Sequence, residues 1–167
     1  LHPVIASAVA GVLREADHAR WRTMPSFRGP ASTLLGIHQQ FRIASERLGL
    51  LAGREAEPDM GWLRRAFRPL AQTLHHHHHA EEAMLFPLVA QQTGVAPAGL
   101  VGDHGTLTAA IEEVVASLTE GADPKRARAT IARFANVLVT HLDREERLVM
   151  PVLLALSPRE AWALLEG

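Results

Sequence analysis

One eleven-residue phrase occurs twice in this chain, at residues 77–87 and 141–151, and the two copies start 64 residues apart. Each copy consists of a His, three further residues, a Glu-Glu pair, an apolar run and a Pro. A His and a Glu four residues apart lie on one face of an α-helix, about one turn from each other. The repeat therefore predicts two helices that each present an imidazole and a carboxylate to a shared interior, where a metal ion could bind both.

A further His precedes each copy of the phrase. His38 lies 39 residues before His77, and His104 lies 37 residues before His141. The chain thus has two helical hairpins of the same design, and internal repetition of this kind fixes the architecture. We predict an all-α fold, a four-helix bundle with these side chains facing its interior.

Apolar residues recur at helical spacing, and no strand-like alternation is present. We expect four long helices, over residues 32–52, 59–89, 98–119 and 124–156. Pro69 lies inside the second of them and predicts a break, a kink or a restart there. Residues 1–31 are expected to form an N-terminal helix and a linker that pack on the bundle formed by residues 32–167. Asp123 has the position of an N-cap, and Ser157 with Glu160 has the spacing of a capping box before a short last helix.

Composition excludes several classes of site. The 167 residues carry a formal net charge of -1, so no electrostatic attraction to nucleic acid is expected. No apolar run approaches the roughly 20 residues of a membrane span. The absence of Cys excludes thiolate ligands and Cys nucleophiles. A metal would be held by imidazole and carboxylate groups, which suit iron, manganese or zinc.

Helical phase places the two ionisable groups of each phrase within an apolar stripe, which also includes Met84 on one helix and Leu148 on the other. Burial of an unpaired carboxylate costs several kcal/mol, so the stripe needs polar partners or a metal. A buried His–Glu hydrogen-bond network without metal is the alternative, although it would leave several charges desolvated. We predict as metal ligands His38, His77, Glu81, His104, His141 and Glu145.

The run of five His at 75–79 is internal and in phase with the second long helix. His77 faces the core, whereas His78 lies about 100° further round, on the side of Glu82. His78 is a candidate for supporting the ligands, and whether it also binds a metal stays open. The other three His of the run, His75, His76 and His79, are expected to face outward.

These motifs together resemble the hemerythrin-like, or HHE cation-binding, domain family over about residues 32–156. The matching elements are the helices of His38 and His104 and the two phrases with their Glu-Glu pairs. The resemblance implies an up-down-up-down four-helix bundle around a non-haem di-iron centre. This centre would have an oxo or hydroxo bridge, and Glu81 and Glu145 would bridge the irons. Manganese or zinc could replace iron.

Two positions depart from the oxygen-carrying members of that family. Those proteins have a second His four residues after the His of the third bundle helix, where this chain has Thr108. They also have an Asp five residues after the His of the last bundle helix, where this chain has Glu146. We expect Thr108 to leave one iron with fewer protein ligands, which favours redox chemistry or sensing over reversible oxygen carriage.

The expected function is therefore a cytoplasmic bacterial protein that binds or senses dioxygen, nitric oxide or iron at a di-iron centre. A catalase-like or other oxidant-detoxifying activity toward peroxide is the enzymatic version of this hypothesis. The alternative is a zinc-bound or metal-free bundle that acts as a structural or interaction module. The expected partners are a small diatomic ligand or peroxide and a redox partner, without nucleic acid or membrane.

Overall fold

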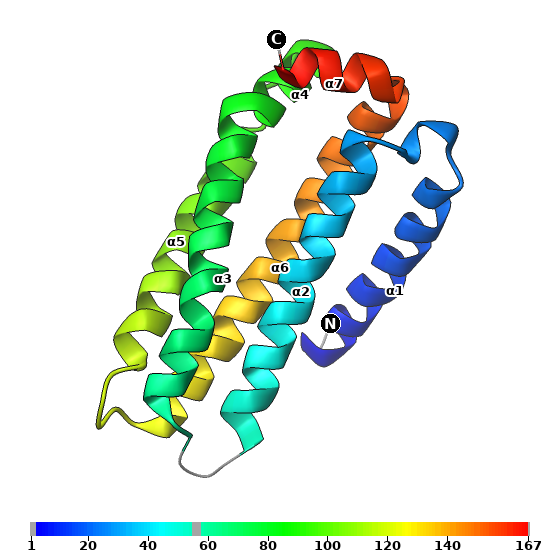
Figure 1. Cartoon of the computed structure of the whole chain (residues 1–167). Coiled ribbons are helices and arrows are strands. Elements are labelled where there is room, and N and C mark those ends of the chain that lie inside the picture. Colours follow the sequence, from blue (N-terminus) through cyan, green and yellow to red (C-terminus); the bar gives the residue numbers. More distant parts are fainter. Residues whose placement is uncertain (1–2, 55–57, 167) are drawn as a thin grey trace.

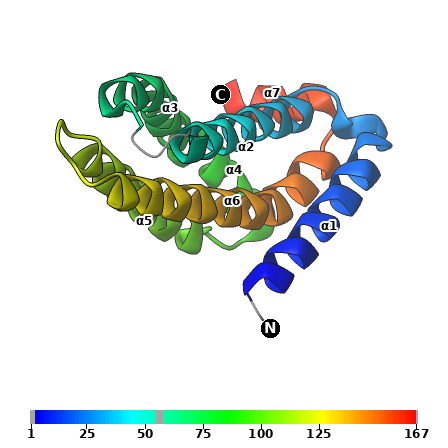
Figure 2. The same ribbon diagram turned by 90° about the horizontal axis from the view of Figure 1, so that it is seen from below.

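Four long helices lie side by side in the computed structural model, which describes residues 3–54 and 58–166, with side chains from residue 10 onward (Figures 1 and 2). Residues 1, 2, 55–57 and 167 lie outside the described residues. The four helices are α2 (Pro30–Arg54), α3 (Met60–Ala80), α5 (Ala98–Ser117) and α6 (Pro124–Ala155). No strand occurs among the described residues, so the predicted all-α class is confirmed.

Shorter helical elements cover the outside and one end of these four helices. α1 (Pro3–Arg22) lies outside them, next to α2 and α6, and the 3₁₀ turn η1 (Pro25–Phe27) connects it to α2 (Figure 2). α7 (Pro158–Glu166) crosses the end of the bundle at which α2 begins (Figure 1). The helix ends agree with the predicted ranges to within a few residues, apart from the second long helix.

The second long helix departs from the prediction at an unexpected place. α3 continues through Pro69, where the sequence suggested a break, a kink or a restart. The irregularity lies instead at η2 (Glu81–Leu85), a π-helical turn that leads into α4 (Phe86–Thr93). The backbone N–H of Phe86 donates to the carbonyl of Glu81, five residues earlier, so this turn is wider than an α-helical turn. Such turns often occur at functional sites.

Side-chain caps fix where several helices begin, as the sequence indicated. The carboxylate of Asp123 accepts a hydrogen bond from the backbone N–H of Lys125 at 2.9 Å. Ser157 and Glu160 form the expected capping box, in which each residue's side chain bonds the other's backbone N–H at 3.2 Å and 2.9 Å. α7 therefore starts at a defined residue directly after α6.

The core is divided into two apolar clusters. One cluster includes Phe67, Leu107 and Phe134, and the other includes Leu35, Leu100 and Met150. On all four long helices, the predicted ligands come between members of one cluster and members of the other. The bundle thus carries a buried layer of His and Glu side chains between two apolar layers, and this layer cannot be stable without polar or metal partners.

Among the described residues, no single helix is both long and apolar enough to cross a membrane, although α6 and α7 pass by length and composition as a pair bent by 111°.

Candidate metal centre

Seven buried or half-buried side chains form two adjoining groups in the middle of the bundle. The ligand atoms within each group all lie within 4.8 Å of one another. One group consists of His38, His77, Glu81 and Glu145, and the other consists of His78, Glu81, His104 and His141. Glu81 belongs to both. The structure therefore brings together all six ligands predicted from the sequence and adds His78.

The carboxylate of Glu81 lies between the two groups. Its Oε1 is 2.7 Å from His77 Nε2 and 3.6 Å from His38 Nε2, while its Oε2 is 3.5 Å from His104 Nε2. Glu145 has a similar reach, since its Oε2 is 3.2 Å from His141 Nε2 and 3.7 Å from His38 Nε2. Glu81 thus reaches imidazoles of both groups, as a bridging ligand would, whereas Glu145 belongs to one group only.

Many of these atoms have no hydrogen-bond partner although they are buried. Both carboxylate oxygens of Glu81 and of Glu145, and the Nε2 atoms of His78, His104 and His141, accept or donate no hydrogen bond among the described residues. Buried polar atoms are nearly always satisfied in native proteins, because an unsatisfied one costs about 1–3 kcal/mol. A set of lone pairs that converge on two points is what metal ions would satisfy, so these residues fit a pair of cations.

Helical phase explains how His77 and His78 can each join a different group. With about 100° per residue, Glu81 lies about 40° from His77 on one side and about 60° from His78 on the other. The two imidazoles therefore flank the carboxylate that the groups share. On α6, the position equivalent to His78 is Leu142, which is buried in an apolar cluster.

The sequence left the role of His78 open, and the structure places this residue among the clustered ligand atoms. His78 is only 6% exposed and stacks on His104, with ring centroids 3.9 Å apart and planes 9° apart. Its phase was measured from His77, although the relevant reference is the shared carboxylate. The other members of the run, His75, His76 and His79, are exposed as predicted.

Thr108 lies outside both groups of ligand atoms. It is exposed, and its hydroxyl donates to the carbonyl of His104 at 3.0 Å. The group that contains His104 has three imidazoles, because His78 supplies the third from another helix. The expectation that this site is short of a protein ligand is therefore a prediction that the structure does not support.

The second Glu of each phrase holds the lone His of a neighbouring helix. Nδ1–H of His104 donates to Glu82 at 2.7 Å, and Nδ1–H of His38 donates to Glu146 at 3.0 Å. These bonds orient each ring and turn its Nε2 toward the clusters. Metal-binding His residues commonly have such a partner, which fixes the tautomer and raises ligand basicity. In each Glu-Glu pair, the first carboxylate thus points into the centre and the second orients an imidazole of a neighbouring helix.

Glu146 also connects the centre to α1. Its Oε2 lies 2.7 Å from His18 Nε2, and its Oε1 accepts from Arg42 Nη1 at 2.7 Å. Arg42 also donates to Asp143 at 2.7 Å, and Asp143 is in turn bound by Arg14. His18, Arg42, Asp143 and Glu146 are all at least nine-tenths buried. Sequence reasoning missed this network, because its members come from three separate helices.

Removal of the imidazole that α1 contributes should destabilise the fold. His18→Leu leaves one oxygen of the buried Glu146 carboxylate without a donor, so the free energy of unfolding should fall by about 1–3 kcal/mol. Urea denaturation measures the change. Arg20→Ala is the matched control on α1, since it breaks only the exposed pair with Asp17, which is worth at most about 1 kcal/mol. Equally small losses in both variants would show that His18 does not hold α1.

Two imidazoles titrate far from their ordinary range. Burial alone would lower the pKa of His38, but the hydrogen bond to Glu146 and the nearby carboxylate of Glu81 outweigh it and raise this pKa to about 9. For His78, burial and the neighbouring His104 act in the same direction and lower the pKa to about 3. His78 is thus neutral at physiological pH, and a neutral imidazole is the form that binds a metal.

The two clustered carboxylates are shifted in opposite directions. Burial would raise the pKa of Glu81, but its contacts with His38 and His77 outweigh burial and hold this pKa below its ordinary value. For Glu145, burial dominates and raises the pKa. Without a metal, the layer therefore keeps a proton on His38 and favours one on Glu145. Metal binding must displace such protons from its ligands.

The metal-free protein should consequently lose stability as the pH rises from about 6.5 to about 9. His38 has a pKa of 6.5 when unfolded and about 9 when folded, so its contribution is complete below 6.5 and lost as the pH passes 9. Glu145, whose folded pKa is also raised, acts in the same direction. The metal-loaded protein should not show this loss, because its ligands are already deprotonated. Urea midpoints at pH 6, 7.5 and 9 measure both forms, and a constant midpoint without metal would contradict the assignment.

Part of the predicted apolar stripe is not buried. Met84 and Leu148 are each 48% exposed, although both were placed on the face of the clustered His. Met84 lies in the wide turn η2, which alters the phase of the residues that follow Glu81. On α6, the buried side is centred nearer to Leu142 than to His141, so Leu148 falls outside it.

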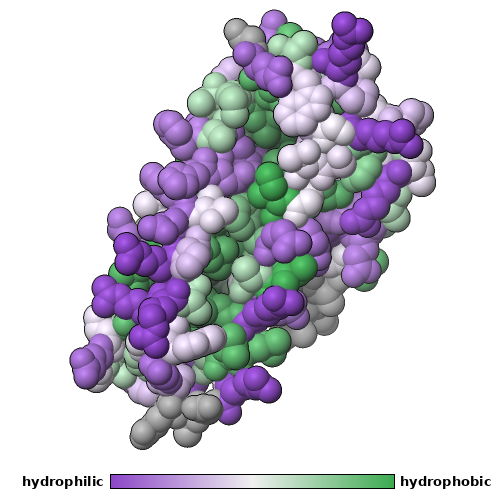
Figure 3. Space-filling model, in the orientation of Figure 1, coloured by the Kyte–Doolittle hydropathy of each residue, from purple (hydrophilic) through white to green (hydrophobic). Residues whose placement is uncertain are grey.

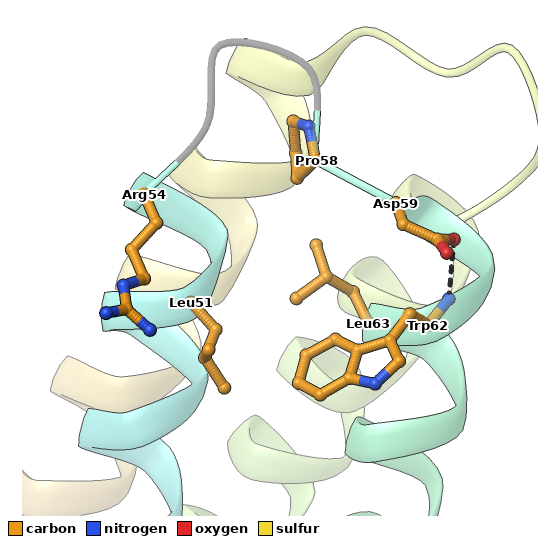
Figure 4. A pocket seen from close by; sticks show the side chains of 6 residues that line it. All are labelled: Leu51, Arg54, Pro58, Asp59, Trp62 and Leu63. Atoms are coloured by element: carbon orange, nitrogen blue, oxygen red, sulfur yellow. Dashed lines mark hydrogen bonds between the residues drawn. The ribbon is translucent and has the colours of Figure 1, made fainter.

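A separate cavity of about 450 Å³ lies at the far end of the bundle, between the end of α2 and the start of α3. Figure 4 shows Leu51, Arg54, Trp62 and Leu63 around it, with Asp59 bonded to the backbone N–H of Trp62. Leu63 is 14 residues from His77, which corresponds to roughly 21 Å along a helix. This cavity is therefore not part of the metal centre.

Comparison with protein families supports the same region of the chain. A model described as the hemerythrin HHE cation-binding domain matches residues 29–153, about three quarters of the sequence. The match includes all seven clustered side chains and leaves α1 and α7 outside. Searches of curated proteins and of solved structures gave no match. The matched region and the cation-binding geometry within it show that the chain belongs to the hemerythrin HHE cation-binding domain family.

Proposed function

We propose that this protein holds a carboxylate-bridged di-iron centre in an up-down-up-down bundle and binds a small oxidising or signalling ligand there. The ligand would be dioxygen, nitric oxide or peroxide. The observation that carries the proposal is the sharing of Glu81 by two groups of buried ligand atoms. Two ions that share a carboxylate lie close enough to act on one small molecule together.

The donor set supports iron. Five imidazoles and two carboxylates converge on the site, without any thiolate. Imidazole and carboxylate ligands suit iron, and also manganese and zinc. An iron pair held in this way supplies electron transfer and open coordination positions for a small ligand. The protein supplies a buried site, oriented imidazoles and the fixed carboxylates that keep the ions together.

The distribution of charge also supports a pair of divalent or trivalent cations. Four carboxylates, from Glu81, Glu82, Glu145 and Glu146, surround the five imidazoles. The oxygens of Glu81 and Glu145 make no hydrogen bond of good geometry among the described residues, whereas Glu146 is bound by His18, His38 and Arg42. The two carboxylates that point into the centre are thus the ones whose oxygens remain available to bind cations.

Metal analysis combined with optical spectroscopy tests this proposal. Protein purified from iron-supplied cells should contain about two irons per chain and show the charge-transfer bands of a bridged iron pair. Zinc in place of iron, or a metal-free bundle that remains fully folded, would instead support a structural role. Steady peroxide turnover by the iron form would identify an enzyme, whereas ligand binding without turnover would identify a sensor or carrier.

A further inference from the structure

An apolar pocket of about 160 Å³ opens beside the metal centre, between α2, η2, α6 and α7. Its walls include Leu34, Ile37, Leu153, Trp162 and Leu165. On the face drawn in Figure 3, hydrophobic surface gathers along the line between α3 and α2 and is flanked by hydrophilic side chains. The surface that these walls expose to the pocket is almost entirely apolar, so it offers few hydrogen bonds to a polar or charged solute.

The floor of the pocket is formed by two of the clustered side chains, His77 and Glu81. Of the seven members of the two groups, His77 is the one that is half-buried, whereas the other six are buried. The pocket therefore meets the centre at its most accessible member, and at the carboxylate that both groups share.

The outer wall of the pocket lies outside the region that matches the family. Trp162 and Leu165 come from α7, which lies beyond residue 153, where the family match ends. α7 packs closely on the start of α2: a Cβ added at Gly29, whose φ is +85°, would lie 3.1 Å from both Pro158 Cβ and Trp162 Nε1. Gly29 thus permits the close approach that places Trp162 over the pocket.

We propose that this pocket is the entry route to the metal centre and that it selects an uncharged diatomic molecule over an anion. The proposal rests on the proposed function and narrows its ligand class to dioxygen or nitric oxide. Transfer of an ion into an apolar pocket without a compensating partner costs several kcal/mol, whereas an apolar gas has no such cost. Apolar cavities near 150 Å³ in proteins stay dry and bind xenon, so the volume is sufficient.

Xenon tests the pocket independently of any metal. Titration of the full chain with xenon, followed by ¹²⁹Xe NMR, should show saturable binding both with and without iron. Ile37→Trp, at a position 37% exposed at the mouth of the pocket, should abolish that binding. Leu50→Trp is the matched control, because Leu50 is an exposed apolar residue of the same helix but does not line the pocket. Thr33→Trp, one turn before Ile37 on the pocket wall, is a second blocking variant in case Ile37→Trp does not fold.

Ligand kinetics then test the route. In the iron-loaded protein, the blocking variant should slow the spectral change caused by nitric oxide at least about tenfold, while the Leu50→Trp control reacts at the wild-type rate. Azide should react more slowly than nitric oxide in the wild type, and the blocking variant should not affect it further. Absence of xenon binding, or an unchanged nitric oxide rate in both blocking variants, overturns the route. Xenon binding in a protein that takes up no iron would instead overturn the di-iron assignment.

Discussion

Glu81→Ala should remove both metal ions, whereas Glu145→Ala should remove only one. Glu81 contributes to both groups of ligand atoms and approaches three imidazoles within 3.6 Å. Glu145 completes one group. We therefore expect iron to fall from about two per chain to near zero in the first variant and to about one in the second. Mass spectrometry of the metal content after reconstitution measures the difference.

Glu112→Ala is the control for this pair, because it removes an exposed carboxylate of α5 outside both groups. It should keep full iron. Circular dichroism establishes that each variant remains helical, since loss of metal through unfolding would carry no information about the ligands. Full iron and an unchanged spectrum in Glu81→Ala would show that this carboxylate is not a bridge.

His78→Ala should lose iron as severely as His77→Ala does, although the two residues are neighbours in the sequence. His78 lies in one group with His104 and His141, and His77 lies in the other group with His38. Each substitution removes one imidazole from a different ion, so each should cost at least about one of the two irons. The double variant should lose both.

The outward part of the same His run provides a matched control. Replacement of the exposed His75, His76 and His79 together by Ala should leave the iron content near wild type. Full iron in His78→Ala with loss in His77→Ala would contradict the structure and return His78 to the supporting role that its helical phase first suggested. Equal loss in the triple variant would mean that the register of the whole helix has been misread.

The sequence alone was enough to predict the helices and the pairing of their motifs. Helix starts follow from local chemistry, as the caps at Asp123 and Ser157 show. The His-x-x-x-Glu spacing depends only on the pitch of one helix, so His77 with Glu81 and His141 with Glu145 could be placed on common faces before any packing was known. The family resemblance adds the expectation of an iron pair and its chemistry, which spacing does not supply.

The tertiary structure decided which directions around each helix point to the centre. His78 enters the site because Glu81, rather than His77, lies on the line between the two groups, and that line is set by α2, α5 and α6 together. The wide turn η2 could not be predicted, because a π-helical turn of five residues produces no recurring spacing of apolar residues in the sequence. At Pro69 the opposite is found: the sequence predicted an interruption, but α3 continues through this residue.

The partners of the second Glu in each phrase were also beyond sequence reasoning. Glu82 and Glu146 hold His104 and His38, which are 22 and 108 residues away along the chain. The contact of His18 with Glu146 spans 128 residues and brings in a helix outside the family match. The position of each side chain around its own helix follows from residue spacing alone, so the sequence determines it. Contacts between helices depend on how apolar faces pack against one another, so only the folded arrangement determines them.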